Sequence, residues 1–200
     1  MPKLVCVRHG QSIWNLKNLF TGWVDVDLTD QGILEAKKAG SLLKEYKFDH
    51  LFTSVLTRAI NTANIIQSEM GVQIETTRDQ SLNERHYGDL QGQNKAEVGE
   101  KFGKEQLHIW RRSFDTPPPN GESLKMTRDR VVPYYNNNIK PFLENGKNIL
   151  IVAHGNSLRG LIMYLEGISE NDIPNLNIPT GSPYLYEMDE KLNITLNKYL

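Results

Sequence analysis

Two histidines in matching sequence contexts are the first residues that could carry out chemistry. His9 follows the apolar run 4–7, His154 follows the apolar run 149–152, and each begins a His-Gly-x-Ser sequence. A neutral imidazole can attack at physiological pH and become a covalent carrier without the separate base that a serine needs. The glycine after each histidine lets a ligand approach the backbone closely. We interpret the pair as a nucleophilic site, against the alternative that each histidine is a hydrogen-bonded structural residue.

Arginines beside these histidines indicate that the ligand is an anion. Arg8 precedes His9 directly, and Arg58 follows a second predicted strand. A guanidinium group suits bidentate contact with phosphate, and a helix that begins after a histidine directs free amides at an anion. Taken alone, Arg58 is read as a solvated helix residue. The alternative of a zinc site is not favoured, because neither histidine belongs to a Cys-x-x-Cys or His-Glu-x-x-His arrangement, so we predict no metal site.

The elements that must position these residues alternate between strands and helices. Short apolar runs predict strands at 4–7, 50–54, about 72–75 and 149–152. A weaker alternation of apolar and polar residues predicts one or two edge strands in 182–200. Helical spacing predicts helices after Thr29, over about 56–70, and over about 123–143, the last kinked or ended locally by Pro133 and Pro141. Residues 79–121 read as loop with short helices. The alternation predicts an α/β sandwich with a mainly parallel sheet.

This arrangement explains how two histidines far apart in the sequence can share one site. In open parallel sheets the ligand lies outside the carboxyl ends of the strands. Both histidines follow predicted strands, so we expect them to meet across one crevice.

Length and composition limit the number of domains and exclude several classes of function. The chain has 200 residues, 23 Lys and Arg against 24 Asp and Glu, and a formal net charge of -1. We predict a single catalytic domain over residues 1–200, with no nucleic-acid partner and no membrane association. Cys6 is the only cysteine, so no intramolecular disulfide can form, and we expect a cytoplasmic protein in which Cys6 is a small core residue.

Several motifs together resemble the histidine phosphatase superfamily and, more narrowly, the 2,3-bisphosphoglycerate-dependent phosphoglycerate mutases. The resemblance runs from Lys3 to about Asp189, and its motifs are, in order, Arg8-His9-Gly10 with Ser12, Trp14 and Asn15, then Phe20-Thr21-Gly22-Trp23, Leu82 to Gly88, Gln91 to Lys95, Trp110-Arg111-Arg112, Ala153 to Arg159, and Asn177 to Gly181. Simple acid phosphatases of the superfamily generally lack the middle motifs. The resemblance implies a three-layer α/β sandwich with helices on both faces of a mainly parallel sheet and an antiparallel edge strand.

The resemblance also implies a role for each matching residue. His9 is expected to carry the phosphoryl group, with Arg8, Arg58, His154 and the amide of Gly155 around it, and Glu84 is expected to act as general acid and base. The alternative is that Glu84 has no catalytic role and only forms an ion pair with Arg85. The remaining expected contacts to substrate are Gln11, Ser12, Asn15, Thr21, Gly22, Arg85, His86, Tyr87, Lys95, Arg111, Arg112, Gly155 and Asn156.

The implied reaction interconverts 3-phosphoglycerate and 2-phosphoglycerate in glycolysis and gluconeogenesis, with 2,3-bisphosphoglycerate as primer and intermediate and no metal. The implied partners are small-molecule phosphoglycerates. A phosphatase of the same superfamily acting on a small phosphorylated metabolite is the first alternative, and a noncatalytic phosphate-binding domain is the second.

The sequence differs from longer mutases at two places. Those proteins carry an extra stretch after the proline-rich loop and a lysine- and alanine-rich tail, and the sequence here has neither. Such regions serve subunit contacts or cover the site. We therefore leave open a monomer or a weak homo-oligomer, and expect some hydrolysis because water can reach the phosphohistidine.

Overall fold

A six-stranded sheet forms the centre of the protein. The computed structural model describes residues 1–200, and the strand order is β3-β2-β4-β1-β5-β6. The strands are β1 (Lys3–Arg8), β2 (His50–Thr53), β3 (Thr76–Arg78), β4 (Ile149–Ala153), β5 (Pro183–Met188) and β6 (Ile194–Tyr199). β1 to β4 pair in parallel, whereas β5 pairs antiparallel with β1 and β6 antiparallel with β5. The predicted mainly parallel sheet with an antiparallel edge pairing is confirmed.

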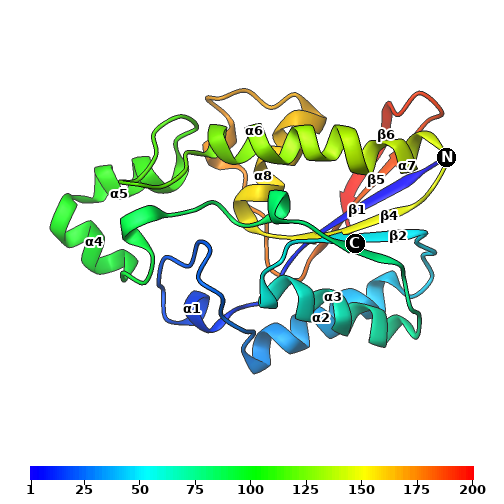
Figure 1. Ribbon diagram of the computed structural model, residues 1–200, viewed down its shortest axis with the longest axis horizontal. Helices are drawn as coiled ribbons and strands as arrows, with labels where there is room; N and C mark the ends of the chain where they lie inside the picture. The colour runs from blue at the N-terminus through cyan, green and yellow to red at the C-terminus, as the bar shows by residue number, and fades with distance from the viewer.

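Helices cover both faces of this sheet (Figure 1). They are α1 (Ile13–Leu16), α2 (Asp30–Leu43), α3 (Thr57–Met70), α4 (Lys95–Phe102), α5 (Lys104–Arg112), α6 (Leu124–Tyr134), α7 (Lys140–Glu144) and α8 (Gly155–Glu166). α2 and α3 pack on one face, and α6, α7 and α8 pack on the other. Within β1, Val5 and Val7 face the first pair of helices, while Leu4 and Cys6 face the second group. Burial on both faces explains why the central strands are uninterrupted apolar runs.

One predicted strand was misplaced. The strand expected at about 72–75 begins at Thr76 instead. α3 ends at Met70 and is followed by Gly71 in a left-handed conformation. The N–H of Ile74 donates to Gln67 Oε1 at 2.7 Å, so Ile74 is buried as part of a loop. The true strand is exposed and polar, so apolar periodicity does not reveal it.

The helix expected at 123–143 is a succession of three segments. α6 is followed by a π-helical segment over Tyr135–Ile139 and then by α7. Pro133 lies inside α6, where it removes a backbone donor, and Pro141 lies in the first turn of α7, where none is needed. The expected interruption near the prolines is confirmed, because α6 ends one residue after Pro133 and α7 begins one residue before Pro141, with the π-helical segment between them.

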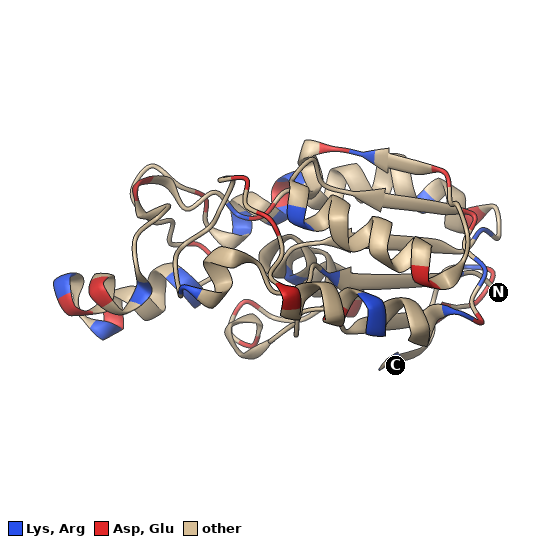
Figure 2. Cartoon of the chain, turned by 90° about the horizontal axis from the view of Figure 1, so that it is seen from below, with Lys and Arg blue, Asp and Glu red and all other residues tan.

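An arm formed by α4 and α5 extends beyond the carboxyl ends of the parallel strands (Figures 1 and 2). A small apolar cluster of Phe20, Leu90, Val98 and Trp110 holds it against the loop after β1. The arm ends with Arg111 and Arg112 in the last turn of α5. It therefore brings cationic side chains to the edge of the sheet where the two histidines follow their strands.

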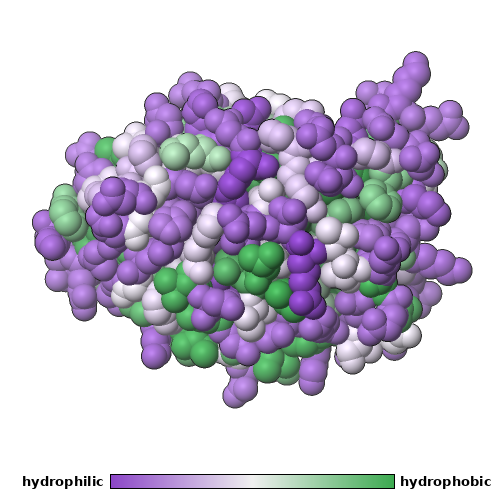
Figure 3. All heavy atoms as spheres, in the orientation of Figure 1, coloured by the Kyte–Doolittle hydropathy of each residue, from purple (hydrophilic) through white to green (hydrophobic).

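The outer face of the molecule is mostly hydrophilic (Figure 3). Apolar side chains are scattered among polar ones on the face seen there, as is usual for a folded domain. No helix is both long enough and apolar enough to traverse a lipid bilayer.

Candidate active site

β1 and the turn that follows it place His9 just beyond the carboxyl end of that strand. Its N–H donates to the carbonyl oxygen of Ala153 at the end of β4 at 2.9 Å. The ring nitrogen Nδ1 lies 2.7 Å from the carbonyl oxygen of Gly10. Because a carbonyl only accepts, Nδ1 carries the hydrogen and Nε2 keeps its lone pair. Burial, with the charges of Arg58 and Arg8, holds the pKa of His9 well below its usual value, so the ring is a neutral nucleophile.

The turn after His9 is packed too tightly for any residue other than glycine at position 10. A Cβ atom on Gly10 would lie 2.2 Å from the carbonyl oxygen of Gly32 in the first turn of α2. The N–H of Gly10 donates to Thr62 Oγ1 of α3 at 3.1 Å. The position of the His9 ring is thus fixed by both helices on this face of the sheet.

Arg8 and Arg58 flank His9 and keep their charge available. Arg58 is 1% exposed and donates to the carbonyl oxygens of Gly22 at 2.8 Å and Val24 at 3.1 Å. Arg8 Nη1 donates to the carbonyl oxygen of Ile178 at 2.8 Å. Burial lowers the pKa of Arg58 to about 10, which leaves it charged at neutral pH. The Nε atoms of both arginines are buried without a hydrogen-bond partner.

Glu84 is held at the N-terminus of α8. It follows the 3₁₀ turn Gln80–Leu82 and is 8% exposed. Its Oε1 accepts from the N–H of Arg85 at 2.8 Å and from the N–H of Asn156 at 3.0 Å. The positive end of the helix favours the carboxylate there. A Cβ on Gly155 would lie 3.7 Å from Glu84 Oε2 and 3.5 Å from Arg8 Nε, so glycine keeps this part of the cavity open.

His154 lies behind the cavity wall. It is fully buried after β4, and its ring centroid is 5.0 Å from that of His9, which confirms that the two histidines meet. Its Nε2 lies 2.7 Å from Ser54 Oγ, which also accepts from the N–H of Leu56 at 3.2 Å. Burial, followed by the charges of Arg58 and His9, holds the pKa of His154 well below its usual value, so this ring is neutral as well.

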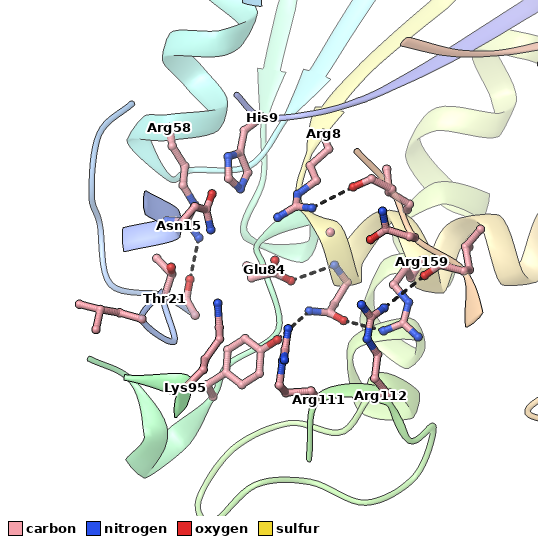
Figure 4. Close-up of a pocket in the computed structure, with 18 residues that line it drawn as sticks. Arg8, His9, Asn15, Thr21, Arg58, Glu84, Lys95, Arg111, Arg112 and Arg159 are labelled. Atoms are coloured by element: carbon pink, nitrogen blue, oxygen red, sulfur yellow. Dashed lines mark hydrogen bonds between the residues drawn. The ribbon is translucent and has the colours of Figure 1, made fainter. Parts of the chain in front are cut away.

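A second group of cations lies across the cavity from His9. In Figure 4, His9, Arg8 and Arg58 lie at one end, Lys95, Arg111 and Arg112 lie at the other, and Glu84 is between them. Lys95 comes from the first turn of α4, and the two arginines come from the last turn of α5. Burial, with the charges of Arg111 and Arg8, lowers the pKa of Lys95 to about 8. The cavity therefore has two cationic ends.

A hydrogen-bond network orients the Tyr87 hydroxyl between these ends. The hydroxyl oxygen accepts from Arg85 Nη2 and from Asn156 Nδ2, both at 3.1 Å. Asn156 Oδ1 accepts in turn from Arg159 Nη1 at 3.0 Å, which fixes which end of the amide faces Tyr87. Because the hydroxyl oxygen already accepts twice, its hydrogen is free to be donated to a ligand in the cavity.

Most of the predicted site residues line one cavity. The structure brings together Arg8, His9, Asn15, Thr21, Gly22, Arg58, Glu84, Tyr87, Lys95, Arg111, Arg112, Gly155 and Asn156.

Five predicted residues lie behind the wall of this cavity. Gln11 accepts from Thr29 at the start of α2, Ser12 caps α1, and Arg85 donates to Tyr87 and to the carbonyl oxygen of Arg111. His86 packs edge-on against Trp23, and His154 is bound to Ser54. These side chains support the wall rather than form it.

Five lining residues were not predicted as ligands. They are Leu19, Arg159, Leu176, Asn177 and Ile178. Arg159 belongs to the motif after His154, and its place four residues into α8 was the available signal. Residues 176–178 are bound to cavity arginines through their backbone, since Arg8 donates to the carbonyl oxygen of Ile178 and Arg112 to that of Leu176. No group of three or more His, Cys, Asp and Glu side chains is arranged to hold a metal ion.

Comparisons with known proteins identify one family over nearly the whole chain. The model of the "Histidine phosphatase superfamily (branch 1)" matches residues 4–197. A 2,3-bisphosphoglycerate-dependent phosphoglycerate mutase of Cytophaga hutchinsonii is 58% identical over 200 residues, covering 100% of this chain and 94% of that protein. One of the same name from Parvibaculum lavamentivorans is 52% identical over 204 residues, covering 100% and 97%.

A solved structure shows the same fold. Bacillus stearothermophilus YhfR superimposes with a TM-score of 0.86 at 24% identity, over 98% of this chain and 95% of that one.

Proposed function

Because the chain belongs to the histidine phosphatase superfamily, we propose that its cavity transfers a phosphoryl group through His9, and that it interconverts 3-phosphoglycerate and 2-phosphoglycerate. One observation carries the proposal beyond the family: the cavity has two cationic ends with Glu84 between them (Figure 4). 3-Phosphoglycerate has a carboxylate at one end, a phosphate at the other and a hydroxyl between them. The substrate therefore matches the cavity in charge and in the order of its groups.

The proposed reaction begins with His9 already phosphorylated on Nε2. The 2-hydroxyl of 3-phosphoglycerate attacks the phosphorus, the P–N bond breaks, and Glu84 takes the hydroxyl proton. The product is 2,3-bisphosphoglycerate, which reorients within the cavity. His9 Nε2 then attacks the 3-phosphate, protonated Glu84 returns its proton to the leaving oxygen, and 2-phosphoglycerate departs from a rephosphorylated enzyme. Atoms and charge balance over the cycle.

Arg8 and Arg58 stabilise the phosphoryl group electrostatically while it is transferred. Their guanidinium groups flank His9, and neither is neutralised by an ion pair. Lys95, Arg111 and Arg112 bind the end of the substrate that does not react, together with the donor hydrogen of Tyr87. The cations at both ends of the cavity fit 2,3-bisphosphoglycerate as the primer, because this ligand carries two phosphates and a carboxylate.

The setting of this activity is glycolysis and gluconeogenesis in the cytoplasm. We extend the proposal to one catalytic domain over residues 1–200 that acts without a metal and has no nucleic-acid or membrane partner. The oligomeric form we propose is a monomer or a weak homo-oligomer.

The test is conversion of 3-phosphoglycerate to 2-phosphoglycerate, followed by phosphorus NMR, with and without 2,3-bisphosphoglycerate and with a metal chelator present. We expect conversion that the chelator does not affect and the bisphosphate stimulates. Release of inorganic phosphate alone would support the phosphatase alternative instead.

Intact-mass measurement tests the carrier directly. After incubation with 2,3-bisphosphoglycerate the protein should gain the mass of one phosphoryl group, and His9→Ala should not. A wild-type protein that never gains this mass would favour the noncatalytic alternative.

A further inference from the structure

Arg130 of α6 lies outside the cavity but binds the segment that carries Glu84. Its guanidinium group donates to the carbonyl oxygens of Ser81 at 2.8 Å, Asn83 at 2.9 Å and Glu84 at 2.8 Å. It also donates to both carboxylate oxygens of Glu122, at 2.9 Å each. One side chain thus ties three carbonyl groups of the segment 81–84 to α6.

Glu122 binds the same segment from its other end. Its Oε2 accepts from the N–H of His86 at 2.8 Å, and its own N–H donates to the carbonyl oxygen of His86 at 2.7 Å. Burial alone would raise the pKa of Glu122, but its hydrogen bond and ion pair with Arg130 outweigh burial and hold that pKa below its usual value. The pair is therefore charged and intact at neutral pH.

Trp23 supplies a second donor to the same backbone atom. Its Nε1 donates to the carbonyl oxygen of Glu84 at 2.6 Å, and the Arg130 guanidinium lies 5.6 Å from the centre of the Trp23 ring. The Glu84 carbonyl thus accepts from two side chains behind the cavity, while the Glu84 carboxylate accepts from two backbone amides at its front. Rotation of the Glu84 backbone would break bonds on both sides.

We propose that Arg130, together with Glu122, is a positioning pair that holds the Glu84 carboxyl where it exchanges a proton with the substrate oxygen. The inference rests on the proposed function, in which Glu84 carries that proton. Proton transfer needs heavy atoms within about 2.6–3.2 Å, so a small displacement of the carboxyl removes the contribution of the acid. Neither member of the pair lines the cavity, and neither touches the substrate.

A comparison of two phosphoryl donors separates this role from general support of the fold. The alkoxide that leaves a phosphoglycerate must be protonated, whereas the p-nitrophenolate that leaves p-nitrophenyl phosphate is stable without a proton. Displacement of Glu84 therefore slows phosphorylation of His9 by 2,3-bisphosphoglycerate and spares phosphorylation by p-nitrophenyl phosphate. Loosening of the whole site would slow both.

The variants are Arg130→Lys, which keeps the charge but cannot reach three carbonyls, and Glu122→Gln, which removes the ion pair. Arg128→Ala is the matched control, because Arg128 is on the same helix and its buried Nε has no hydrogen-bond partner. Rates of His9 phosphorylation are followed by rapid quench and intact mass with each donor.

We expect Arg130→Lys to slow the reaction with 2,3-bisphosphoglycerate by about 10- to 100-fold, and the reaction with p-nitrophenyl phosphate by less than about twofold. Glu122→Gln should act in the same direction to a smaller extent, and Arg128→Ala should match wild type with both donors. If both donors slow equally in Arg130→Lys, or neither does, the inference is wrong.

Two further results keep the test decisive. If Arg130→Lys does not fold, Trp23→Phe replaces it, because it removes only the second donor to the Glu84 carbonyl and should show the same selective loss. If wild type itself is never phosphorylated by 2,3-bisphosphoglycerate, the proposed function fails, which is a different outcome from equal loss with two working donors.

Discussion

Binding of 2,3-bisphosphoglycerate should be accompanied by uptake of a proton by Lys95. In the free protein, burial and the neighbouring charges of Arg111 and Arg8 lower the pKa of Lys95 to about 8. A bound polyanion offsets both charges and pairs with the ammonium group, so the pKa rises towards its ordinary range. Because the ligand raises the pKa, protons are taken up on binding, and affinity falls as pH rises through 8.

The size of the effect follows from the same value. At pH 8 about half of the Lys95 side chains are unprotonated, so binding takes up about half a proton per site. Between pH 8 and pH 9 the protonated fraction falls from about one half to about one tenth, which weakens binding about fivefold. The phosphate groups contribute little over this range, because their second ionisation has a pKa of about 6.

Isothermal titration calorimetry measures this uptake. The experiment uses the His9→Ala background, in which no phosphoryl transfer occurs, and compares the heat of binding at pH 8 in two buffers with different enthalpies of ionisation. Lys95→Arg in the same background is the control, because it keeps the charge but does not titrate near pH 8, and its uptake should vanish. Equal heats in both buffers with Lys95 present, or release of protons, would refute the reasoning.

Three further predictions concern the turn after β1, the core and the Tyr87 network. Gly10→Ala should lower the free energy of unfolding by about 2 kcal/mol or more in urea titrations, because its Cβ would meet backbone at 2.2 Å; an unchanged midpoint would contradict the tight packing. Cys6, which is 1% exposed and whose pKa burial raises to about 12, should resist iodoacetamide at pH 8 until the protein is unfolded in urea; rapid native labelling would contradict this. Arg159→Lys, which cannot hold both Asn156 and the carbonyl oxygen of Ile173, should raise the KM for 3-phosphoglycerate about tenfold, and a change confined to kcat would count against the network.

The sequence predicted the centre of the site because that part depends on local pattern. The runs 4–7 and 149–152 are apolar without alternation, which is typical of strands buried on both faces, and each ends at a His-Gly-x-Ser sequence. Adjacent parallel strands then bring His9 and His154 together at the carboxyl edge of the sheet, as the pairing of β1 with β4 shows. The resemblance to a known family added the cationic residues of the α4 and α5 arm, which no local pattern identifies.

Other features could not be predicted because they depend on contacts between distant segments. β3 is a polar, exposed edge strand, so its pairing with β2 leaves no mark in hydrophobic periodicity. Arg130 resembles an ordinary helix residue in the sequence, and only the fold shows that it binds the backbone of Glu84. Asn177 and Ile178 belong to a motif of the family resemblance, but the hydrogen bonds to the carbonyl oxygens of Leu176 and Ile178 leave no mark in the sequence, because every residue has a carbonyl group.

The backbone hydrogen bonds that hold four of the cavity arginines explain how these side chains keep their charge available to a ligand. Their guanidinium groups donate to backbone carbonyl oxygens: Arg8 to Ile178, Arg58 to Gly22 and Val24, Arg112 to Leu176, and Arg159 to Ile173. Arg85, behind the cavity wall, donates to the carbonyl oxygen of Arg111. Arg130, outside the cavity, is the arginine that forms an ion pair with a carboxylate. A carbonyl dipole orients a guanidinium group without cancelling its charge, whereas a carboxylate would neutralise it. The cavity therefore keeps its positive potential until a phosphorylated ligand supplies the missing negative charge, and the sequence cannot show this because the acceptors are backbone atoms.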